Sequence, residues 1–257
     1  MVAEPRIRAL FFDIDGTLAT MDTRRIPDSA LEALAAVRER GVKVLIATGR
    51  PEPMARWIED QLVPDGYACA NGQFCRLGGR VIRCQHLDHD DVLVARDQVA
   101  HGLYAMTVVE DGDWFLSGPP GTVDRGGVGL PVRDAALIGG RPVLQLMLQG
   151  GPELDDLLLG ATRNLLSVRW TSAFGDIIPR GGGKQVGMQA FLDELGIGRG
   201  ECAAFGDGAN DIAMLEYAGV GVAMGNASDE VKARADCVTT SVEGDGVARA
   251  LARLGLL

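Results

Sequence analysis

Hydrophobic positions first gather into a short, nearly continuous run at residues 7–12, which reads Ile-Arg-Ala-Leu-Phe-Phe. Such a run is typical of a central strand that is covered on both faces. It ends in Asp-Ile-Asp-Gly-Thr at residues 13–17, and because Asp is a poor strand residue, the strand should leave the core there. Side chains alternate along an extended chain, so Asp13 and Asp15 would share one face. Two carboxylates held so close need a cation between them or one shared proton.

The pattern that follows alternates helices with strands. Residues 28–40 place Leu31, Leu34 and Ala35 on one helical face, and Gly41 stands where a helix commonly ends. Residues 42–47 are nearly all apolar and indicate a second buried strand. A strand, a helix and a strand in this order predict a parallel pair and an α/β domain.

Polar residues again mark the carboxyl ends of the next two strands. The second strand ends in Thr48-Gly49-Arg50, with Pro51 at a plausible first helical position. In open α/β sheets, ligands bind at this edge. A third strand near residues 67–70 ends in Asn71-Gly72, which we interpret as a turn, and a small hairpin should follow at residues 73–84.

From about His86 the order of predicted helices and strands changes. A helix at residues 88–101 and a hairpin at residues 104–117 are followed later by a second helix at 153–164 and a second hairpin at 166–179, which turns around Phe174-Gly175. This weak internal echo predicts an inserted α+β domain of two helix-hairpin units, connected by the Gly- and Pro-rich residues 118–142.

The last part of the chain returns to the first pattern. Three glycines at 181–183 resemble a flexible joint, and a helix should begin near Lys184, whose charge there opposes the helix dipole. An exposed surface lysine is the alternative. The strand at residues 202–205 ends in Gly-Asp-Gly-Ala-Asn-Asp at 206–211, which again places acids at a carboxyl end. Strands near 220–224 and 236–239 should complete the sheet.

Charge and composition exclude several classes of partner. The formal net charge is −10, with 25 basic against 35 acidic residues, so the chain repels nucleic acid and acidic membranes. No apolar run approaches the ~20 residues of a membrane span, and residues 1–6 lack the hydrophobic core of a signal peptide, so we expect a cytoplasmic protein. The five cysteines show no Cys-x-x-Cys spacing, which favours buried thiols over a disulfide framework or a thiolate zinc site.

Taken together, the motifs closely resemble those of the haloacid dehalogenase superfamily of phosphohydrolases, in its Cof-type branch. The resemblance rests on residues 13–17, 48–50, 184 and 206–211, and also on Asn71-Gly72 and the Gly-Asp-Gly-Val at 244–247. It implies an α/β fold, with a Rossmann-like parallel-sheet core at residues 1–85 and 181–257 and an inserted α+β cap at residues 86–180.

The resemblance also implies a Mg²⁺-dependent phosphatase of small phosphorylated metabolites such as sugar phosphates. Asp13 would attack phosphorus and form an aspartyl phosphate, and Asp15 would serve as general acid and then as general base. Thr48 and Lys184 would hold the phosphoryl oxygens, and Asn210 would position Lys184 or the phosphate. The carboxylates would repel a phosphate without a hard cation, so Mg²⁺ is expected on Asp13, Asp15 (through its backbone carbonyl), Asp207 and Asp211, the last directly or through water. The expected substrate-binding residues are Gly16, Thr17, Gly49, Arg50, Asn71 and Asn210.

Other interpretations of these residues exist. A dinucleotide-binding site would need Gly-x-Gly-x-x-Gly after the first strand, which is absent, and a receiver domain would carry neither the second acid nor the insertion. A phosphosugar mutase, or a regulatory protein that binds phosphate without chemistry, would share the motifs. The cluster His86, Asp88, His89, Asp90 and Asp91 could bind a second metal ion, although a solvated helix cap is the more common role of such a run.

Overall fold

The first strand, β1 (Ala9–Phe12), lies in the middle of the larger sheet and is fully buried. In the computed structural model, which describes residues 7–119, 129–169 and 171–257, it pairs in parallel with β2 (Lys43–Ala47) and with β11 (Cys202–Gly206). Phe11 stands opposite Leu45 on one side and Ala204 on the other. The predicted buried central strand is therefore confirmed.

The chain divides into two compact units. The first, here called the core unit, is formed by Met1–Arg83 and Gly183–Leu257, and the second, the inserted unit, by Cys84–Gly182. Each unit has its own sheet and its own hydrophobic core. The prediction about residues 1–6, and the centre of the predicted 118–142 connection, lie outside the described residues.

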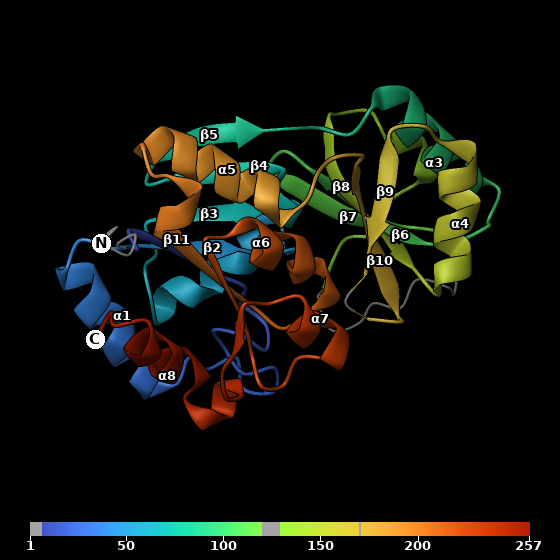
Figure 1. Cartoon of the computed structure of the whole chain (residues 1–257). Helices are drawn as coiled ribbons and strands as arrows, with labels where there is room; N and C mark the ends of the chain where they lie inside the picture. Colours follow the sequence, from blue (N-terminus) through green and yellow to red (C-terminus); the bar gives the residue numbers. More distant parts are fainter. Residues whose placement is uncertain (1–6, 120–128, 170) are drawn as a thin grey trace. The chain divides into compact units, whose positions relative to one another are not determined.

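The sheet of the core unit has the strand order β13-β12-β11-β1-β2-β3-β4-β5 (Figure 1). The strands from β13 to β3 run parallel, and β4 runs antiparallel to β3. Parallel order at the centre and a hairpin at one edge are what the sequence predicted, so the α/β class is confirmed. The remaining strands are β3 (Gly66–Cys69), β4 (Phe74–Leu77), β5 (Arg80–Cys84), β12 (Val220–Ala223) and β13 (Cys237–Val238).

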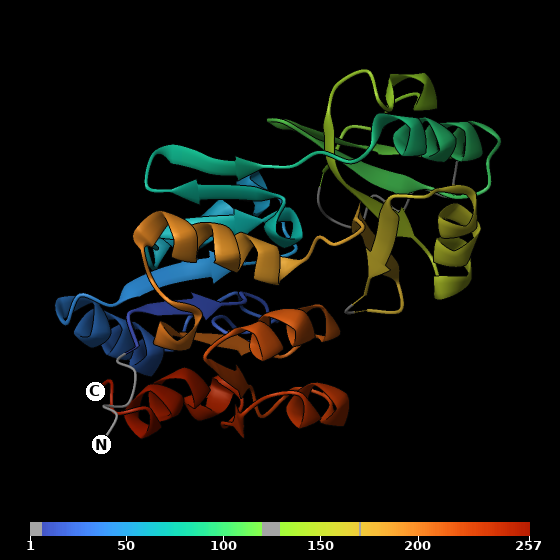
Figure 2. The same ribbon diagram turned by 45° about the horizontal axis from the view of Figure 1, so that its top comes forward.

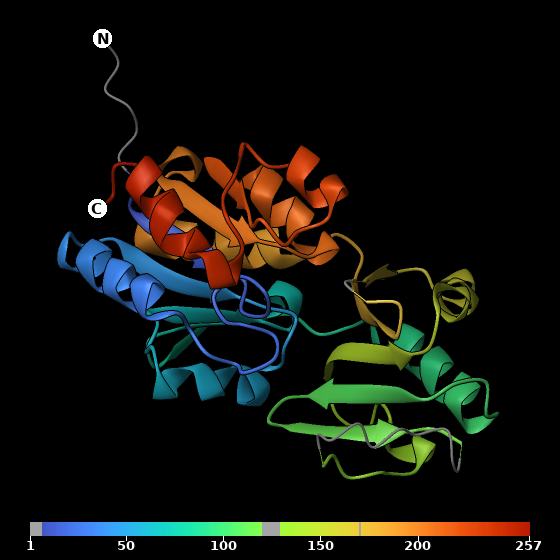
Figure 3. The same cartoon turned by 90° about the horizontal axis from the view of Figure 1, so that it is seen from below.

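Helices cover both faces of this sheet. Leu10 and Phe12 of β1 pack in one cluster with residues of α1 and α8, which lie side by side in Figure 3. Ala9 and Phe11 point to the opposite face and pack with residues of α5 and α6. The helices of the core unit are α1 (Asp28–Glu39), α2 (Glu52–Ala55), α5 (Lys184–Leu195), α6 (Ile212–Tyr217), α7 (Asp229–Ala233) and α8 (Gly246–Arg253).

The inserted unit is an antiparallel sheet in the order β7-β6-β8-β10-β9, with two helices packed against it (Figure 2). Its helices resemble the predicted ones, and each is followed by a hairpin. Its elements are α3 (His89–Ala100), β6 (Met106–Glu110), β7 (Asp113–Ser117), β8 (Val143–Gln149), α4 (Pro152–Ala161), β9 (Leu165–Val168) and β10 (Phe174–Pro179).

Two details of the inserted unit differ from the expectation. The strand β8 was not predicted, yet it is central, because it pairs with both β6 and β10 and joins the two helix-hairpin units. The second hairpin does not turn at Phe174-Gly175, because both residues are in β10, where they pair with Gln149 and Leu148 of β8.

Within the described residues, no helix is both long enough and apolar enough to cross a lipid bilayer.

Candidate active site

The parallel core sheet brings the polar strand ends to one edge. Asp13 and Asp15 follow β1, Thr48 to Arg50 follow β2, and Asp207 to Asp211 follow β11. Since β11, β1 and β2 are neighbours with matching direction, their carboxyl ends lie together. This is the edge where α/β sheets bind ligands.

Lys184 reaches this edge from the first residue of α5 and is fully buried. Its Nζ donates to Asp13 Oδ1 at 2.6 Å and to Asp211 Oδ1 at 2.5 Å. Burial alone would lower the pKa of Lys184, but the charges of these two carboxylates raise it above its ordinary value. The ammonium group therefore stays charged, and the two carboxylates offset the unfavourable placement of that charge at a helix start. The alternative of an exposed surface lysine is wrong.

Three carboxylates of the site lie close enough together to hold one metal ion. Asp13, Asp207 and Asp211 each offer an oxygen, and these oxygens lie within 4.8 Å of one another. Burial and the neighbouring acids raise the pKa of Asp13 well above its ordinary value, an effect that Lys184 opposes. Burial also raises the pKa of Asp207 to about 6. The folded chain thus holds these acids closer together than their charges favour.

The donor set fits a hard divalent cation. The four site carboxylates outnumber the two site cations, Lys184 and Arg50, by two charges, and every ligand atom offered is an oxygen. Oxygen donors and this charge balance are what Mg²⁺ requires. The two oxygens of Asp211 already have protein partners, because Oδ1 accepts from Lys184 and Oδ2 accepts from the backbone N–H groups of Asp207 and Gly208, at 3.0 and 2.9 Å.

Asp207 is held from two sides. Thr17 Oγ1 donates to its Oδ1 at 2.7 Å, and Asn226 Nδ2 donates to its Oδ2 at 3.1 Å. Asn226 Nδ2 also donates to the carbonyl of Gly16 at 2.9 Å, so one amide joins the loop after β1 to the loop after β11. Gly16 has a φ of +82°, and a Cβ there would stand 2.4 Å from Asp207 Oδ2, so only glycine fits.

Asp15 forms a forked ion pair with Arg50. Arg50 Nε donates to Oδ2 at 2.6 Å and Nη2 donates to Oδ1 at 2.8 Å. Both side chains are mostly shielded from solvent. The fork leaves the backbone carbonyl of Asp15 as the candidate metal ligand that the sequence predicts. It also places Arg50 on Asp15, whereas the sequence predicts a substrate contact for Arg50.

Three other predicted site residues, Thr48, Asn71 and Asn210, lie in the loops after the core strands. Thr48 is buried, and its Oγ1 accepts from the backbone N–H of Arg50 at 3.2 Å. Asn71, buried and with a φ of 53°, donates its backbone N–H to the Thr48 carbonyl at 3.0 Å and so lies beside Gly49. Asn210 is half-buried next to Asp211, but the hydrogen bonds of Lys184 within the described chain go to Asp13 and Asp211.

Asn226 is the site residue that the sequence did not reveal. It lies in the turn after β12, and an asparagine in such a turn has no spacing that distinguishes it from an ordinary turn residue. Only the position of β12 beside β11, read together with the Asp207 loop, could have suggested it.

The acidic run after His86 separates into different roles. Asp88 caps α3 by accepting from the backbone N–H groups of Asp90 and Asp91, as the capping interpretation predicts. Asp91 is buried and accepts from the backbone N–H groups of Arg163 and Asn164 at 3.1 and 2.8 Å. His89 and Asp90 are exposed.

Comparison with known proteins identifies the family. A family profile described as haloacid dehalogenase-like hydrolase matches residues 10–126 and 152–251, which is most of the chain. Among curated proteins, YkrA of Bacillus subtilis (strain 168), to which a phosphatase function is provisionally attached, is 33% identical over 97% of this chain and 98% of its own length.

Comparison with solved structures points to the same family. The subclass IIB sugar phosphatase BT4131 matches with a TM-score of 0.90 and 33% identity, over 97% of this chain and all of its own. The phosphatase BT1666 from Bacteroides thetaiotaomicron matches with a TM-score of 0.91 and 31% identity, over 100% of this chain and 98% of its own. The matching profile, relatives and strand-end motifs show that the chain belongs to the haloacid dehalogenase-like hydrolases, in their Cof-type branch, and is a phosphoric monoester hydrolase.

Proposed function

We propose that the protein is a Mg²⁺-dependent phosphatase that hydrolyses small phosphorylated metabolites through an aspartyl phosphate on Asp13. The observation that carries the proposal is the environment of Asp13. It is buried at the ligand edge of the sheet, its Oδ1 is bound to Lys184, and one of its oxygens lies within 4.8 Å of one oxygen each of Asp207 and Asp211. Transfer of a phosphoryl group to a carboxylate requires that carboxylate as the nucleophile and positive charge close to the phosphoryl oxygens, and this environment offers both.

The reaction follows from these groups. Asp13 attacks phosphorus, the bond to the ester oxygen breaks, and Asp15 gives that oxygen a proton. Asp15 then takes a proton from water, which attacks the aspartyl phosphate and returns Asp13 with inorganic phosphate. Because Arg50 holds Asp15 in a fork, the ion pair between them weakens when Asp15 carries the proton.

Mg²⁺ bound here would neutralise phosphoryl charge as the transition state forms. Asp13, Asp207 and the carbonyl of Asp15 would hold the ion. Asp211 would hold the ion directly or through water, and its two oxygens also hold Lys184 and the loop that carries Asp207. Lys184 keeps the Asp13 carboxylate oriented and screens the repulsion between the acids.

Replacing the nucleophile tests the proposal directly. We expect Asp13→Asn to lower the turnover of p-nitrophenyl phosphate by at least about a thousandfold, because an amide oxygen is a poor nucleophile. The measurement is steady-state phosphate release, with circular dichroism to check the fold. The control is Asp28→Asn, an exposed aspartate at the start of α1 that pairs with Arg25. If Asp13→Asn turned over at the rate of that control, Asp13 would not be the nucleophile.

Removing metal tests the cofactor. We expect the enzyme to lose turnover after dialysis against a chelator and to recover it with added Mg²⁺, because the site carries two uncompensated negative charges beside a phosphate ester. Recovery should be saturable, and Asp207→Asn should need a higher Mg²⁺ concentration. Full turnover in the chelated enzyme would contradict the proposal.

The substrate class is proposed from relatives and architecture. BT4131 is a sugar phosphatase, and we propose a compact polar phosphomonoester of this kind for the present enzyme. We also propose that residues 86–180 act as a cap that sets specificity. A product assay with a hexose 1-phosphate distinguishes hydrolysis, which releases phosphate, from mutase activity, which gives the isomeric ester. The cytoplasmic location expected from the sequence stays a prediction.

A further inference from the structure

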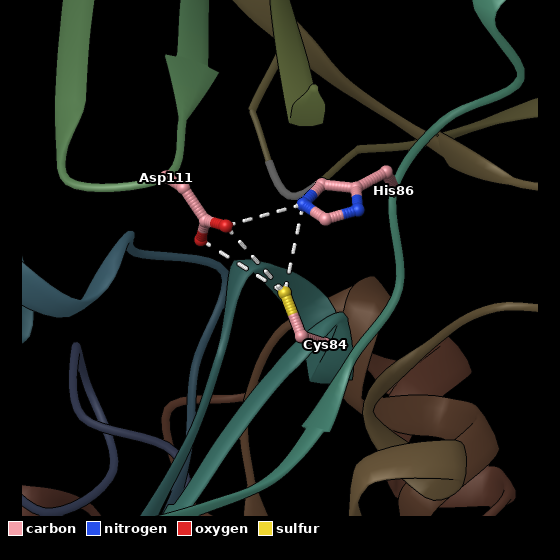
Figure 4. A group of neighbouring side chains, drawn as sticks. All are labelled: Cys84, His86 and Asp111. Atoms are coloured by element: carbon pink, nitrogen blue, oxygen red, sulfur yellow. Dashed lines mark hydrogen bonds and ion pairs between the residues drawn. The ribbon is translucent and has the colours of Figure 1, made fainter. Parts of the chain in front are cut away.

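Three side chains with metal-binding atoms meet in the inserted unit, in a cluster of their own (Figure 4). Cys84 is the last residue of β5, His86 follows in the segment that leads to α3, and Asp111 stands in the turn between β6 and β7. Sulfur, imidazole nitrogen and carboxylate oxygen are the three donor types that bind zinc.

The separations between the donor atoms match a shared ion. Cys84 Sγ lies 3.5 Å from His86 Nε2, and His86 Nε2 lies 3.4 Å from Asp111 Oδ2. Zinc ligands at about 2.0–2.3 Å from the ion, placed at tetrahedral angles, are about 3.4–3.6 Å apart. The remaining separations, from Cys84 Sγ to the two Asp111 oxygens, are 3.9 and 4.0 Å, and a small rotation of an exposed side chain closes that difference.

The arrangement differs from a catalytic relay. In a Cys-His-Asp relay, the thiol and the carboxylate contact opposite nitrogens of the imidazole, so that a proton can pass through the ring. Here both face the same atom, His86 Nε2 (Figure 4). The Cys84 thiol can also donate weakly to the two Asp111 oxygens, at 3.9 and 4.0 Å, so the three groups gather around one another and form no relay through the ring. A cation placed between them would bind all three donor atoms at once.

The surroundings leave the cluster accessible to an ion. Cys84 is exposed, and the side chains of His86 and Asp111 are 32% and 50% exposed, so one side of the cluster faces solvent. The nearby cation Arg141 donates to the backbone carbonyl of Asp111 at 3.0 Å and approaches Glu110 and Asp113, so its charge is directed to other acceptors.

We propose that Cys84, His86 and Asp111 bind a zinc-class divalent ion, with water from the exposed side as the fourth ligand. The sulfur and nitrogen donors separate this site chemically from the oxygen-only carboxylates of the active site. The ion fixes the segment after β5 to the turn between β6 and β7. Sequence spacing did not predict it, because Cys84 has no neighbouring cysteine and its carboxylate partner lies in a distant turn.

Cobalt(II) titration of the full chain in excess Mg²⁺ tests this proposal. Mg²⁺ occupies the oxygen site, and only a thiolate ligand gives a sulfur-to-cobalt charge-transfer band in the near ultraviolet. We expect the band in the wild type, its displacement by Zn²⁺, and its loss in Cys84→Ser. We expect His86→Asn and Asp111→Asn each to weaken Zn²⁺ binding at least about tenfold in a competition with a chromophoric chelator.

Matched controls keep the test specific. Cys237→Ser removes a half-buried thiol of the core unit, and His101→Asn removes an exposed imidazole beyond the end of α3; both should bind like the wild type. A wild type without the band would overturn the proposal, and so would a band that survives in Cys84→Ser. Equal zinc affinity in His86→Asn and His101→Asn would overturn it as well. Phosphatase activity is not the readout, so this result is independent of the proposed function.

Discussion

The fork between Arg50 and Asp15 is the residue contact with the clearest chemical consequence. Lysine keeps the charge of arginine but cannot make two parallel hydrogen bonds to one carboxylate. We expect Arg50→Lys to lower kcat about tenfold for an alkyl phosphate, whose leaving group needs the proton of Asp15. The loss should be smaller for p-nitrophenyl phosphate, whose leaving group departs without protonation. Steady-state kinetics with the two esters measure this difference.

Arg56 provides the matched control for this substitution. It forms a similar fork with Glu59, at 3.1 and 3.2 Å, on the exposed surface of the core unit. Arg56→Lys should leave both esters unaffected. If Arg50→Lys slowed the two esters equally, Arg50 would act on the phosphoryl group common to both and not through Asp15.

The sequence predicted which residues belong to the candidate site better than it predicted which partners they bind. Acids that end apolar runs identify Asp13 and Asp207, because burying a strand and stopping it at a charge is a local pattern. What Thr17 and Asn226 bind depends on strands that are neighbours in the sheet and distant in the chain. His86 shows the same limit: acids follow it at residues 88, 90 and 91, but its carboxylate partner in the fold is Asp111.

Among the elements, β2 and β3 are joined at their starts by one carboxylate. Asp65 accepts from the Val44 N–H at 3.0 Å and from Lys43 Nζ at 3.0 Å, and Arg38 also pairs with it. Burial would raise the pKa of Asp65, but these partners outweigh burial and lower it. A lowered pKa in the folded state stabilises the protein above the unfolded pKa of about 3.9, and this stability is lost as pH falls through the folded value.

We therefore expect Asp65→Asn to lower the free energy of unfolding by about 1–3 kcal/mol at pH 7. The difference from the wild type should shrink as pH falls below about 4. Urea unfolding at several pH values measures both effects. The comparison variant is again Asp28→Asn, whose partners are highly exposed and should contribute little. A deficit in Asp65→Asn that stayed constant down to pH 2 would rule out the carboxylate charge as its cause.

The element that the sequence missed, β8, shows why strands of an antiparallel sheet are harder to predict. Residues 143–149 are apolar with two glutamines, a pattern without strict alternation. Their strand partners, β6 and β10, belong to different helix-hairpin units. The parallel core strands were easier, because each carries its own apolar run and its own polar end.

For the whole molecule, the two-unit organisation separates the proposed chemistry from the proposed specificity. The proposed catalytic groups all belong to the core unit, which has its own hydrophobic clusters. We expect a chain with Cys84–Gly182 replaced by a short linker to hydrolyse p-nitrophenyl phosphate detectably, since the nucleophile and metal ligands remain. It should lose discrimination among phosphorylated metabolites, because a cap supplies contacts to the rest of the substrate.

A panel of phosphorylated metabolites, tested on both chains in Mg²⁺, measures this effect as the spread of kcat/KM. Circular dichroism should first establish that the shortened chain is folded. A folded shortened chain with the same substrate ranking as the full chain would move specificity to the core loops, where Arg50 and Asn71 would be the residues to test.

The pairing of β1 with β11 also constrains the order in which the chain can fold during synthesis. Ala9 stands opposite Cys202, so the two central strands can pair only after residue 202 of the 257 residues has been made. Closing so long a loop costs chain entropy and slows folding. The inserted unit is continuous in sequence and can fold before that closure. Asp13 and Asp207 therefore cannot come together before β11 has been synthesised and has paired with β1.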